Sequence, residues 1–203
     1  MNKRLTNNLK RERQVIAQES ARIMIGHGIR DYSHAKQKAA DRLNMSSNGS
    51  LPSNKEIELA ISEQLQIFDS KNHEKLLRKM RKTALSIMQI FKAYSPRLVG
   101  PVLKGTADKN SAINFHIFTD SPESIAFEIT NMNIKFKSYE RRLKTCHGNF
   151  AMYAGFEFNF NNEIIQITIF PFDGIRQSPN SPINGKPMKR ADINVVINLL
   201  ANV

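Results

Sequence analysis

The chain has 203 residues, 40% of them hydrophobic, and a formal net charge of +12 at pH 7. That length suits one domain with a helical extension, or two small domains. No stretch approaches the ~20 apolar residues of a membrane span, and the charged N-terminus lacks the apolar run of a secretory signal. The single cysteine, Cys146, excludes an internal disulfide and a multi-cysteine zinc site. We therefore expect a cytoplasmic protein with no membrane partner, in an oligomeric state that stays open.

The positive charge is concentrated in the first half of the chain. Residues 1–104 carry a net charge of +11, whereas residues 105–203 carry +1. A positive field of this kind attracts polyanions and speeds their association. Nucleic acid, either RNA or DNA, is therefore an expected partner, and a solvated basic surface that binds nothing is the alternative.

The N-terminal part predicts two helices. Residues 1–8 read as a frayed polar start, and residues 9–27 predict a helix that Gly28 ends. Asp31 is placed to cap a second helix over residues 32–43. The pair resembles a helix-turn-helix, and an ordinary helical hairpin is the alternative. In the DNA-binding reading, the residues that face DNA are Ser33, His34, Lys36 and Lys38.

Two further helices are expected after a linker over residues 46–53. Ser53 and Glu56 form a capping box, which opens a helix with Ile57, Ile61, Leu65 and Phe68 facing inward. A second helix is predicted over residues 73–94, ended by Pro96. Its apolar stripe consists of Leu77, Met80, Ala84, Ile87, Met88 and Phe91. We place the boundary between a basic helical region (1–70) and an αβ domain (71–203) in this part of the chain.

The rest of the chain predicts a mixed αβ arrangement, so the expected fold class is α+β. Strand-like segments cover residues 97–103, 112–118, 134–143, 150–160 and 163–170. Helices are expected over residues 120–132 and 191–200, the last with Ile193, Val196, Ile197 and Leu200 inward. Asn161-Asn162 predicts a hairpin turn. Residues 171–187 form a long loop. The overlapping basic segment from Arg176 to Arg190 is either a lid over the cleft or a surface loop.

The segment between residues 97 and 118 carries the strongest functional signal. Alternation places Ile113, Phe115 and Ile117 on one side of a strand, and leaves Asn114 and His116 on the other. A glycine-punctuated loop precedes that strand. A polar strand face beside such a loop is typical of a phosphate or metal site.

Residues 99–117, VGPVLKGTADKNSAINFHI, resemble the glycine loop and second strand of polymerase-beta-type nucleotidyltransferases, whose bacterial form reads FGSRARGTAREDSDIDLLV. The two align without a gap. The resemblance covers about residues 73–170 and implies a nucleotidyltransferase-like mixed sheet flanked by helices. It also implies that phosphate is bound by Gly100, Lys104, Gly105 and Thr106.

The departures from that family fall at its catalytic positions. Pro101 replaces the motif serine and offers neither a hydroxyl nor a backbone N–H. Ala112 and Asn114 replace the two aspartates, and the third carboxylate position falls on Gln166. Two Mg²⁺ ions need anionic oxygen ligands, so we expect a degenerate centre with no certain cofactor. Mg²⁺ is expected only if the site is active, in which case His116 would serve with Asn114 and Gln166, or with a nearby acid such as Asp108.

The whole chain also resembles a group of bacterial proteins of similar length, through Gly28–Tyr32, Leu51–Glu58, Arg97–Ala107 and Phe170–Ala191. Some of these are labelled UDP-N-acetylmuramate–alanine ligases. The label conflicts with the sequence, because such a ligase needs a Gly-Lys-Thr/Ser phosphate loop and this chain has none.

Three functional hypotheses follow. The preferred one is a degenerate nucleotidyltransferase-like protein that binds a nucleotide or nucleic acid without transferring a nucleotidyl group. The others are an active nucleotidyltransferase with an unorthodox metal site, and a DNA-binding protein acting through its N-terminal helices. Basic residues expected to contact nucleic acid are Lys36, Lys38, Arg42, Arg78, Lys79, Arg81, Lys82, Arg141 and Arg142.

Overall fold

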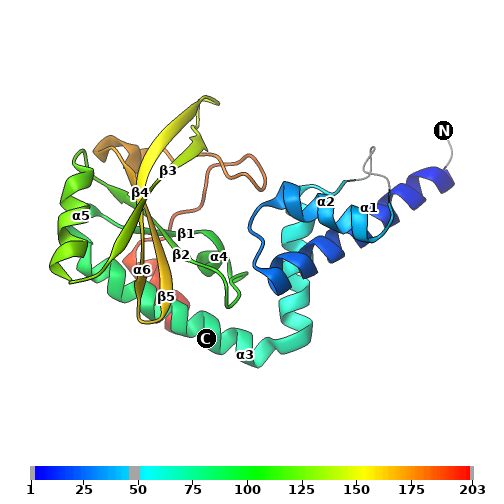
Figure 1. The fold of residues 1–203 in the computed structure, drawn as a ribbon, viewed down its shortest axis with the longest axis horizontal. Coiled ribbons are helices and arrows are strands. Elements are labelled where there is room, and N and C mark those ends of the chain that lie inside the picture. Colours follow the sequence, from blue (N-terminus) through cyan, green and yellow to red (C-terminus); the bar gives the residue numbers. More distant parts are fainter. Residues whose placement is uncertain (1–2, 46–50, 202–203) are drawn as a thin grey trace. The chain divides into compact units, whose positions relative to one another are not determined.

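The computed structural model describes residues 3–45 and 51–201, with side chains for all of these except residues 3–8, 66, 68 and 69 (Figure 1). The chain divides into two compact units. The helical unit comprises residues 1–73 and 182–184, and the sheet unit comprises residues 74–181 and 185–203. Along the part of the chain that the structure describes, no helix is both long enough and apolar enough to cross a membrane.

The helical unit contains α1 (Lys3–His27), α2 (Tyr32–Arg42) and the first part of α3 (Asn54–Ile90). The predicted cap of α2 is confirmed, because the Asp31 carboxylate accepts a hydrogen bond from the His34 backbone N–H at 2.7 Å. The capping box of α3 is also confirmed: the Ser53 N–H donates to the Glu56 carboxylate at 2.6 Å, and the Glu56 N–H donates to Ser53 Oγ at 3.2 Å.

Three expectations in this region need correction or fall outside the description. α1 begins at Lys3, so the prediction that residues 1–8 are frayed is wrong for residues 3–8. These residues are helical, and none of them is a glycine or proline that would interrupt a helix. The predicted linker lies outside the described residues at positions 46–50. The side chain of Phe68, expected to face inward, lies outside them too.

α3 is one continuous helix of 37 residues, whereas the sequence predicted two. Residues 69–73 contain neither glycine nor proline. Ser70, Lys71 and Asn72 are exposed, and polar side chains that point to solvent are compatible with a helix. α3 ends at Ile90, earlier than predicted, and a short 3₁₀ helix, η1 (Lys92–Tyr94), leads to Ser95 with a φ of 49°. The predicted apolar stripe from Leu77 to Phe91 is confirmed, and all of its members are buried.

The sheet unit is built on a five-stranded mixed sheet with the strand order β1-β2-β5-β4-β3. β2 and β5 run parallel, and the other neighbours are antiparallel. The strands are β1 (Arg97–Val99), β2 (Ile113–Phe118), β3 (Phe136–Lys144), β4 (Phe150–Phe160) and β5 (Glu163–Phe170). The predicted α+β class, a helical segment followed by a mixed sheet flanked by helices, is confirmed.

The first strand is shorter than predicted. It stops at Val99, and the chain turns into the five-residue helix α4 (Gly100–Lys104). Gly100 has a φ of 75°, which a residue with a side chain rarely adopts, and Pro101 fits the first helical position. Gly105, with a φ of 80°, closes α4. Residues 100–103 of the predicted strand therefore belong to a helical turn instead.

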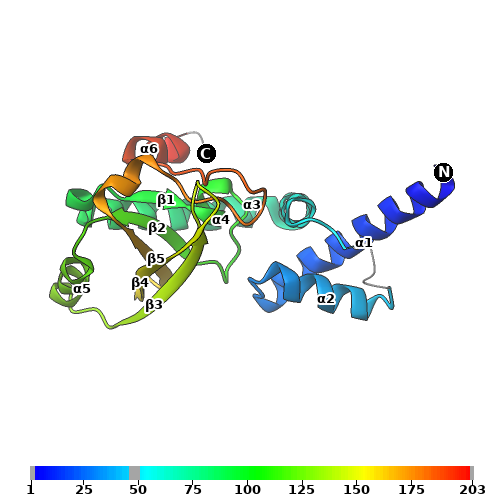
Figure 2. The same cartoon turned by 90° about the horizontal axis from the view of Figure 1, so that it is seen from above.

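Alternation gives the sheet two different faces. Ile113, Phe115 and Ile117 of β2 belong to the main hydrophobic core together with α3 and α5 (Pro122–Asn131), which flank the sheet (Figures 1 and 2). We call the opposite side the polar face. By strand register, its side chains include Arg97, Asn114, His116, Phe118, Tyr139, Arg141, Tyr153, Glu157, Gln166, Thr168 and Phe170.

The remaining connections agree with the sequence in most respects. Asn161 and Asn162 both have positive φ in the β4–β5 turn, as predicted. In α6 (Ile193–Ala201), Val196 is buried as expected, but Ile197 is 45% exposed, so its inward prediction is wrong. Position 197 follows 196 by 100° around the helix and so leaves the buried side.

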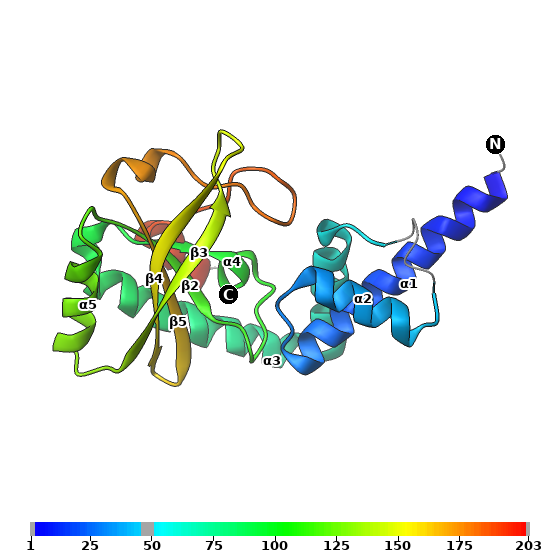
Figure 3. The same ribbon diagram turned by 45° about the horizontal axis from the view of Figure 1, so that its top comes forward.

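The β3–β4 hairpin projects beyond the rest of the sheet, and the long loop after β5 passes close to it (Figure 3). That loop starts with the 3₁₀ helix η2 (Phe172–Arg176). The Asn180 backbone N–H donates to the Lys144 carbonyl at 2.7 Å, and the Asn180 side chain donates to the Thr145 carbonyl at 3.1 Å. The loop is therefore fastened to the end of the hairpin.

Candidate functional site

The polar face brings together the positions that the sequence resemblance assigns to metal ligands. Asn114 on β2 and Gln166 on β5 are direct partners in the parallel register. Ala112 lies two residues before Asn114, and its carbonyl accepts a hydrogen bond from Asn114 Nδ2 at 3.1 Å. Strand geometry thus places these neutral residues beside each other, although none of them offers an anionic ligand.

Gln166 is held by two charged neighbours on the polar face. Arg141 Nη2 donates to Gln166 Oε1 at 2.9 Å, and Gln166 Nε2 donates to Glu157 Oε2 at 2.6 Å. Both ends of the amide are therefore engaged within the protein. A guanidinium beside the third ligand position also supplies positive charge where a divalent cation would sit, which disfavours binding of that cation.

The metal alternative of the sequence analysis has little geometric support. Among the residues that the structure describes, no group of three or more His, Cys, Asp or Glu side chains is close enough to hold a metal ion. Asp108 Oδ1 accepts from the Asn110 backbone N–H and from Ser111 Oγ, both at 2.9 Å. Asp108 therefore organises its own turn.

His116 is buried on the polar face, with 2% of its surface exposed. Its Nδ1 accepts a hydrogen bond from Arg190 Nε at 3.0 Å, so the neutral ring carries its proton on Nε2. Burial lowers the pKa of His116 well below its usual value, and the nearby charges of Arg190 and Arg141 lower it further. His116 is therefore a neutral acceptor for an arginine.

This burial predicts a pH dependence of stability. Because the folded-state pKa of His116 lies below the unfolded value of about 6.5, the unfolded chain binds the proton first as the pH falls. The contribution of neutral His116 to the free energy of unfolding is therefore complete above about pH 6.5. Below that pH the free energy of unfolding falls by up to about 1.4 kcal/mol per pH unit. Urea unfolding at pH 7.5 and 5.5 should show a larger loss for the wild type than for His116→Gln. Equal losses would contradict the buried neutral assignment.

Arg190 fixes the C-terminal end of the long loop to the polar face. Its guanidinium lies 4.9 Å from the ring centroids of both Phe118 and Phe170, and its Nη1 donates to the Gly174 carbonyl at 2.8 Å. Its Nη2 is buried and has no hydrogen-bond partner in the described structure. Burial, reinforced by the charge of Arg97 and opposed by Tyr153, lowers the pKa of Arg190 to about 10.

Tyr139 crosses the polar face above a glycine. Its hydroxyl donates to the Ile167 carbonyl at 2.9 Å and lies 3.1 Å from Thr168 Oγ1. A Cβ built on Gly155 would lie 2.4 Å from the Tyr139 ring, so only glycine leaves room for the ring. Burial raises the pKa of Tyr139.

Sequence reasoning singled out neither Glu157 nor Tyr139. The signal was present, because alternation along residues 150–160 places Tyr153, Gly155 and Glu157 on one side of that strand. The hydrogen bond between Arg190 and His116 joins residues that are 74 positions apart in the chain. A local sequence pattern could not have predicted this contact.

The predicted phosphate loop is only partly free to bind phosphate. The backbone N–H groups of Gly105 and Thr106 both donate to the Pro101 carbonyl, which closes α4. Lys104 is exposed at the end of that helix. Gly100 packs against Asn114, since a Cβ built on it would lie 3.0 Å from Asn114 Nδ2. The loop therefore joins the candidate site through Gly100 and ends in an exposed lysine.

The basic residues of the sheet unit do not share one surface. Arg81 is 7% exposed and donates from Nε to the Val102 carbonyl at 3.4 Å. The prediction that Arg81 contacts nucleic acid is therefore wrong. Lys79 Nζ pairs with Glu163 at 2.7 Å, whereas Arg78 and Lys82 are exposed. The two arginines of β3 lie on opposite faces of the sheet. Arg141 lies on the polar face, and Arg142 lies on the other face, 4.1 Å from the Phe150 ring centroid.

Within the helical unit, Lys38 and Arg42 are four residues apart on one side of α2 and both are exposed. Arg42 Nη1 pairs with Glu19 at 3.0 Å. Lys36 lies about 200° around the helix from Lys38, and burial lowers its pKa. Of the three predicted contacts on α2, Lys38 and Arg42 therefore form the exposed pair.

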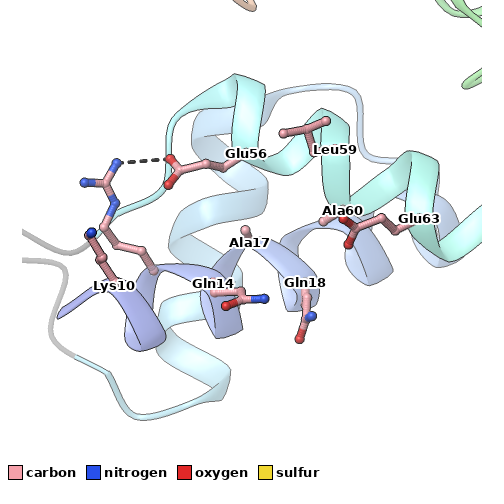
Figure 4. A pocket seen from close by; sticks show the side chains of 9 residues that line it. Lys10, Gln14, Ala17, Gln18, Glu56, Leu59, Ala60 and Glu63 are labelled. Carbon is pink, nitrogen blue, oxygen red and sulfur yellow. Dashed lines mark hydrogen bonds and ion pairs between the residues drawn. The ribbon is translucent and has the colours of Figure 1, made fainter. Parts of the chain in front are cut away.

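The helical unit also contains a pocket of about 400 Å³ between α1 and α3 (Figure 4). Arg13 Nη2 pairs there with Glu56 at 3.0 Å, and Arg13 Nε is buried without a hydrogen-bond partner among the described residues. The lining comes from Lys10, Arg13, Gln14, Ala17 and Gln18 of α1 and from Glu56, Leu59, Ala60 and Glu63 of α3. None of the predicted site residues lines this pocket.

Comparisons with known proteins add little. No protein-family model matches the chain, and no curated protein matches it significantly, so nothing supports the ligase label. Among solved structures, the chain is similar to the Cid1 poly(U) polymerase in a crystal structure with MgGTP bound, which is described as revealing the mechanism for UTP selectivity. The identity is 18%, the TM-score is 0.32, and the match covers 58% of this chain and 38% of that chain. A TM-score this low says nothing about function.

Proposed function

We propose that the sheet unit is a nucleotidyltransferase-like domain with a degenerate metal centre, which binds a nucleotide or nucleic acid rather than catalysing nucleotidyl transfer. The observation that carries this proposal is the register pairing of Asn114 with Gln166. Both occupy positions that the resemblance assigns to metal ligands. Neither can offset the charge of a divalent cation.

The hydrogen bonds around Gln166 support loss of catalysis. Two-metal phosphoryl transfer needs two cations about 4 Å apart, held by shared carboxylates. Here the central amide is committed to Arg141 and Glu157. Arginine can itself bind phosphate, because its planar N–H groups match phosphate oxygens. Binding without transfer is therefore the chemistry that this arrangement favours.

The charge of the chain supports an anionic ligand. The first 104 residues carry nearly all of the net positive charge, and exposed cations such as Lys38, Arg78, Lys82 and Lys104 can attract a polyanion. Within the sheet unit, a nucleic acid could use Arg78, Lys82 or Lys104 in addition to the polar face. A mononucleotide would use the polar face alone.

Titration calorimetry with ATP, GTP, CTP and UTP tests the proposal. We expect at least one nucleotide to bind with an affinity that changes less than about threefold when Mn²⁺ replaces EDTA, because no metal bridges the phosphates. Incubation with a labelled nucleotide, Mn²⁺ and an RNA primer should give no label transfer. Metal-dependent binding with label transfer would show an active enzyme instead, and failure of all four nucleotides and of RNA to bind would reject the proposal.

A further inference from the structure

Three arginines surround His116 on the polar face. Arg97 is its register partner on β1, and Arg190 donates to its Nδ1 at 3.0 Å. Arg141 reaches the same region from β3, and its charge contributes to the lowered pKa of His116. Within the described structure, none of these three arginines lies within 4.0 Å of a carboxylate oxygen. Three like charges therefore converge with no ion pair to offset them.

The hydrogen bonds of these arginines leave donors unused. Among the residues that the structure describes, Arg190 Nη2 is buried without a hydrogen-bond partner. Within the same residues, Arg97 donates only to the carbonyls of Ser95 and Pro96, at 3.4 and 3.2 Å. An unpaired buried donor is costly, and an anionic oxygen that reached it would remove that cost. Phe118 and Phe170 hold the Arg190 guanidinium in place before any ligand arrives. The donors are thus oriented in advance.

We propose that Arg97, Arg141 and Arg190 form an anion site that binds a phosphate chain, such as a diphosphate or triphosphate group, without a metal ion. The inference rests on the proposed function, since it names the part of a nucleotide that the polar face would grip. It differs from the sequence expectation, in which the glycine loop binds phosphate. Guanidinium groups give two parallel hydrogen bonds to phosphate oxygens, and these bonds are stronger where water is excluded.

Binding of inorganic pyrophosphate in EDTA, measured by calorimetry, tests this site separately from nucleotide recognition. Arg97→Gln and Arg141→Gln should each weaken pyrophosphate binding by about tenfold or more, the equivalent of one charged hydrogen bond. Arg142→Gln is the matched control, because it removes the same charge from the next residue on the opposite face. It should change the affinity by less than about twofold. Thermal melting should confirm that each variant is folded, and Arg97 offers the safer variant because its hydrogen bonds are long.

The outcomes separate the two proposals. Nucleotide binding that is unaffected by Arg97→Gln and Arg141→Gln would overturn the arginine site and leave the proposed function standing. Pyrophosphate binding that depends on these arginines, without binding of any nucleotide or RNA, would support the site and reject the proposed function. Equal weakening by Arg142→Gln would show a general charge effect and overturn the site. Absence of binding by both pyrophosphate and nucleotides would overturn both.

Discussion

Changing Asn114 to Asp together with Gln166 to Glu is expected to create a Mn²⁺ site in the sheet unit. The two residues are direct partners on parallel strands, and Gln166 lies 2.6 Å from the Glu157 carboxylate. The double variant would therefore line up three carboxylates across β2, β5 and β4. Hard divalent cations prefer such oxygen ligands.

The expected signature is stabilisation that depends on metal. Without metal, the carboxylate of Gln166→Glu would lie between Arg141 and Glu157. Because the ion pair with Arg141 offsets the repulsion from Glu157, the melting temperature should stay near that of the wild type. Saturating Mn²⁺, at about 100 times its dissociation constant, should add about 2.7 kcal/mol to the free energy of unfolding. Melting curves with Mn²⁺ and with EDTA measure this difference, and electron paramagnetic resonance counts the bound ions.

A matched control adds the same two charges elsewhere. Gln89→Glu with Asn198→Asp changes two exposed residues of the sheet unit, on α3 and α6, which pack on the hydrophobic core. The melting temperature of this control should respond to Mn²⁺ as that of the wild type does. If the Asn114 and Gln166 double variant responds no more than this control, the two positions do not frame a cation site.

Gly155→Ala is expected to destabilise the protein by about 3 kcal/mol, near the upper end for overpacking of a core. A Cβ at this position would lie 2.4 Å from the Tyr139 ring and 2.6 Å from the Ile167 carbonyl oxygen. The ring is itself anchored by the Tyr139 hydroxyl, and the carbonyl belongs to the neighbouring strand β5. Neither neighbour can move without breaking sheet contacts. Denaturant unfolding measures the loss.

Gly26→Ala provides the opposite control. Gly26 lies inside α1, nothing lies within 4 Å of its built Cβ, and its φ is not positive. Alanine there should stabilise the protein by about 0.5–1 kcal/mol through helix propensity. Adding Tyr139→Ala to Gly155→Ala should restore only part of the loss, since the clash with the Ile167 carbonyl remains. If Gly155→Ala leaves the free energy of unfolding unchanged, the sheet relaxes around the added methyl group.

Much of the fold follows from periodicity in the sequence. Alternation in residues 113–117 and 165–169 is strict, so the faces carrying Asn114 and Gln166 could be assigned from residues alone. Their direct pairing could not, because register between strands about 50 residues apart depends on tertiary packing. The resemblance to nucleotidyltransferases assigned both residues to ligand positions without fixing their register, and the structure pairs them directly.

Other errors have local causes. Arg81 follows Leu77 by one helical turn and so shares its buried side, which a helical count would have revealed. Val99 and Val102 suggested a continuous strand, but Gly100 and Pro101 together favour a turn into a helix. The cluster of Arg97, Arg141 and Arg190 comes from three separate parts of the chain, and only the folded sheet unites it.

The tyrosine over Gly155 makes the polar face visible to spectroscopy. The chain contains no tryptophan and four tyrosines, so tyrosine dominates its intrinsic fluorescence. Two of the four, Tyr139 and Tyr153, lie on the polar face, and Tyr153 stacks 4.4 Å from Phe170. Nucleotide bases absorb in the same near-ultraviolet range, whereas pyrophosphate does not. Tyrosine emission can therefore report occupation of this face by pyrophosphate without any label.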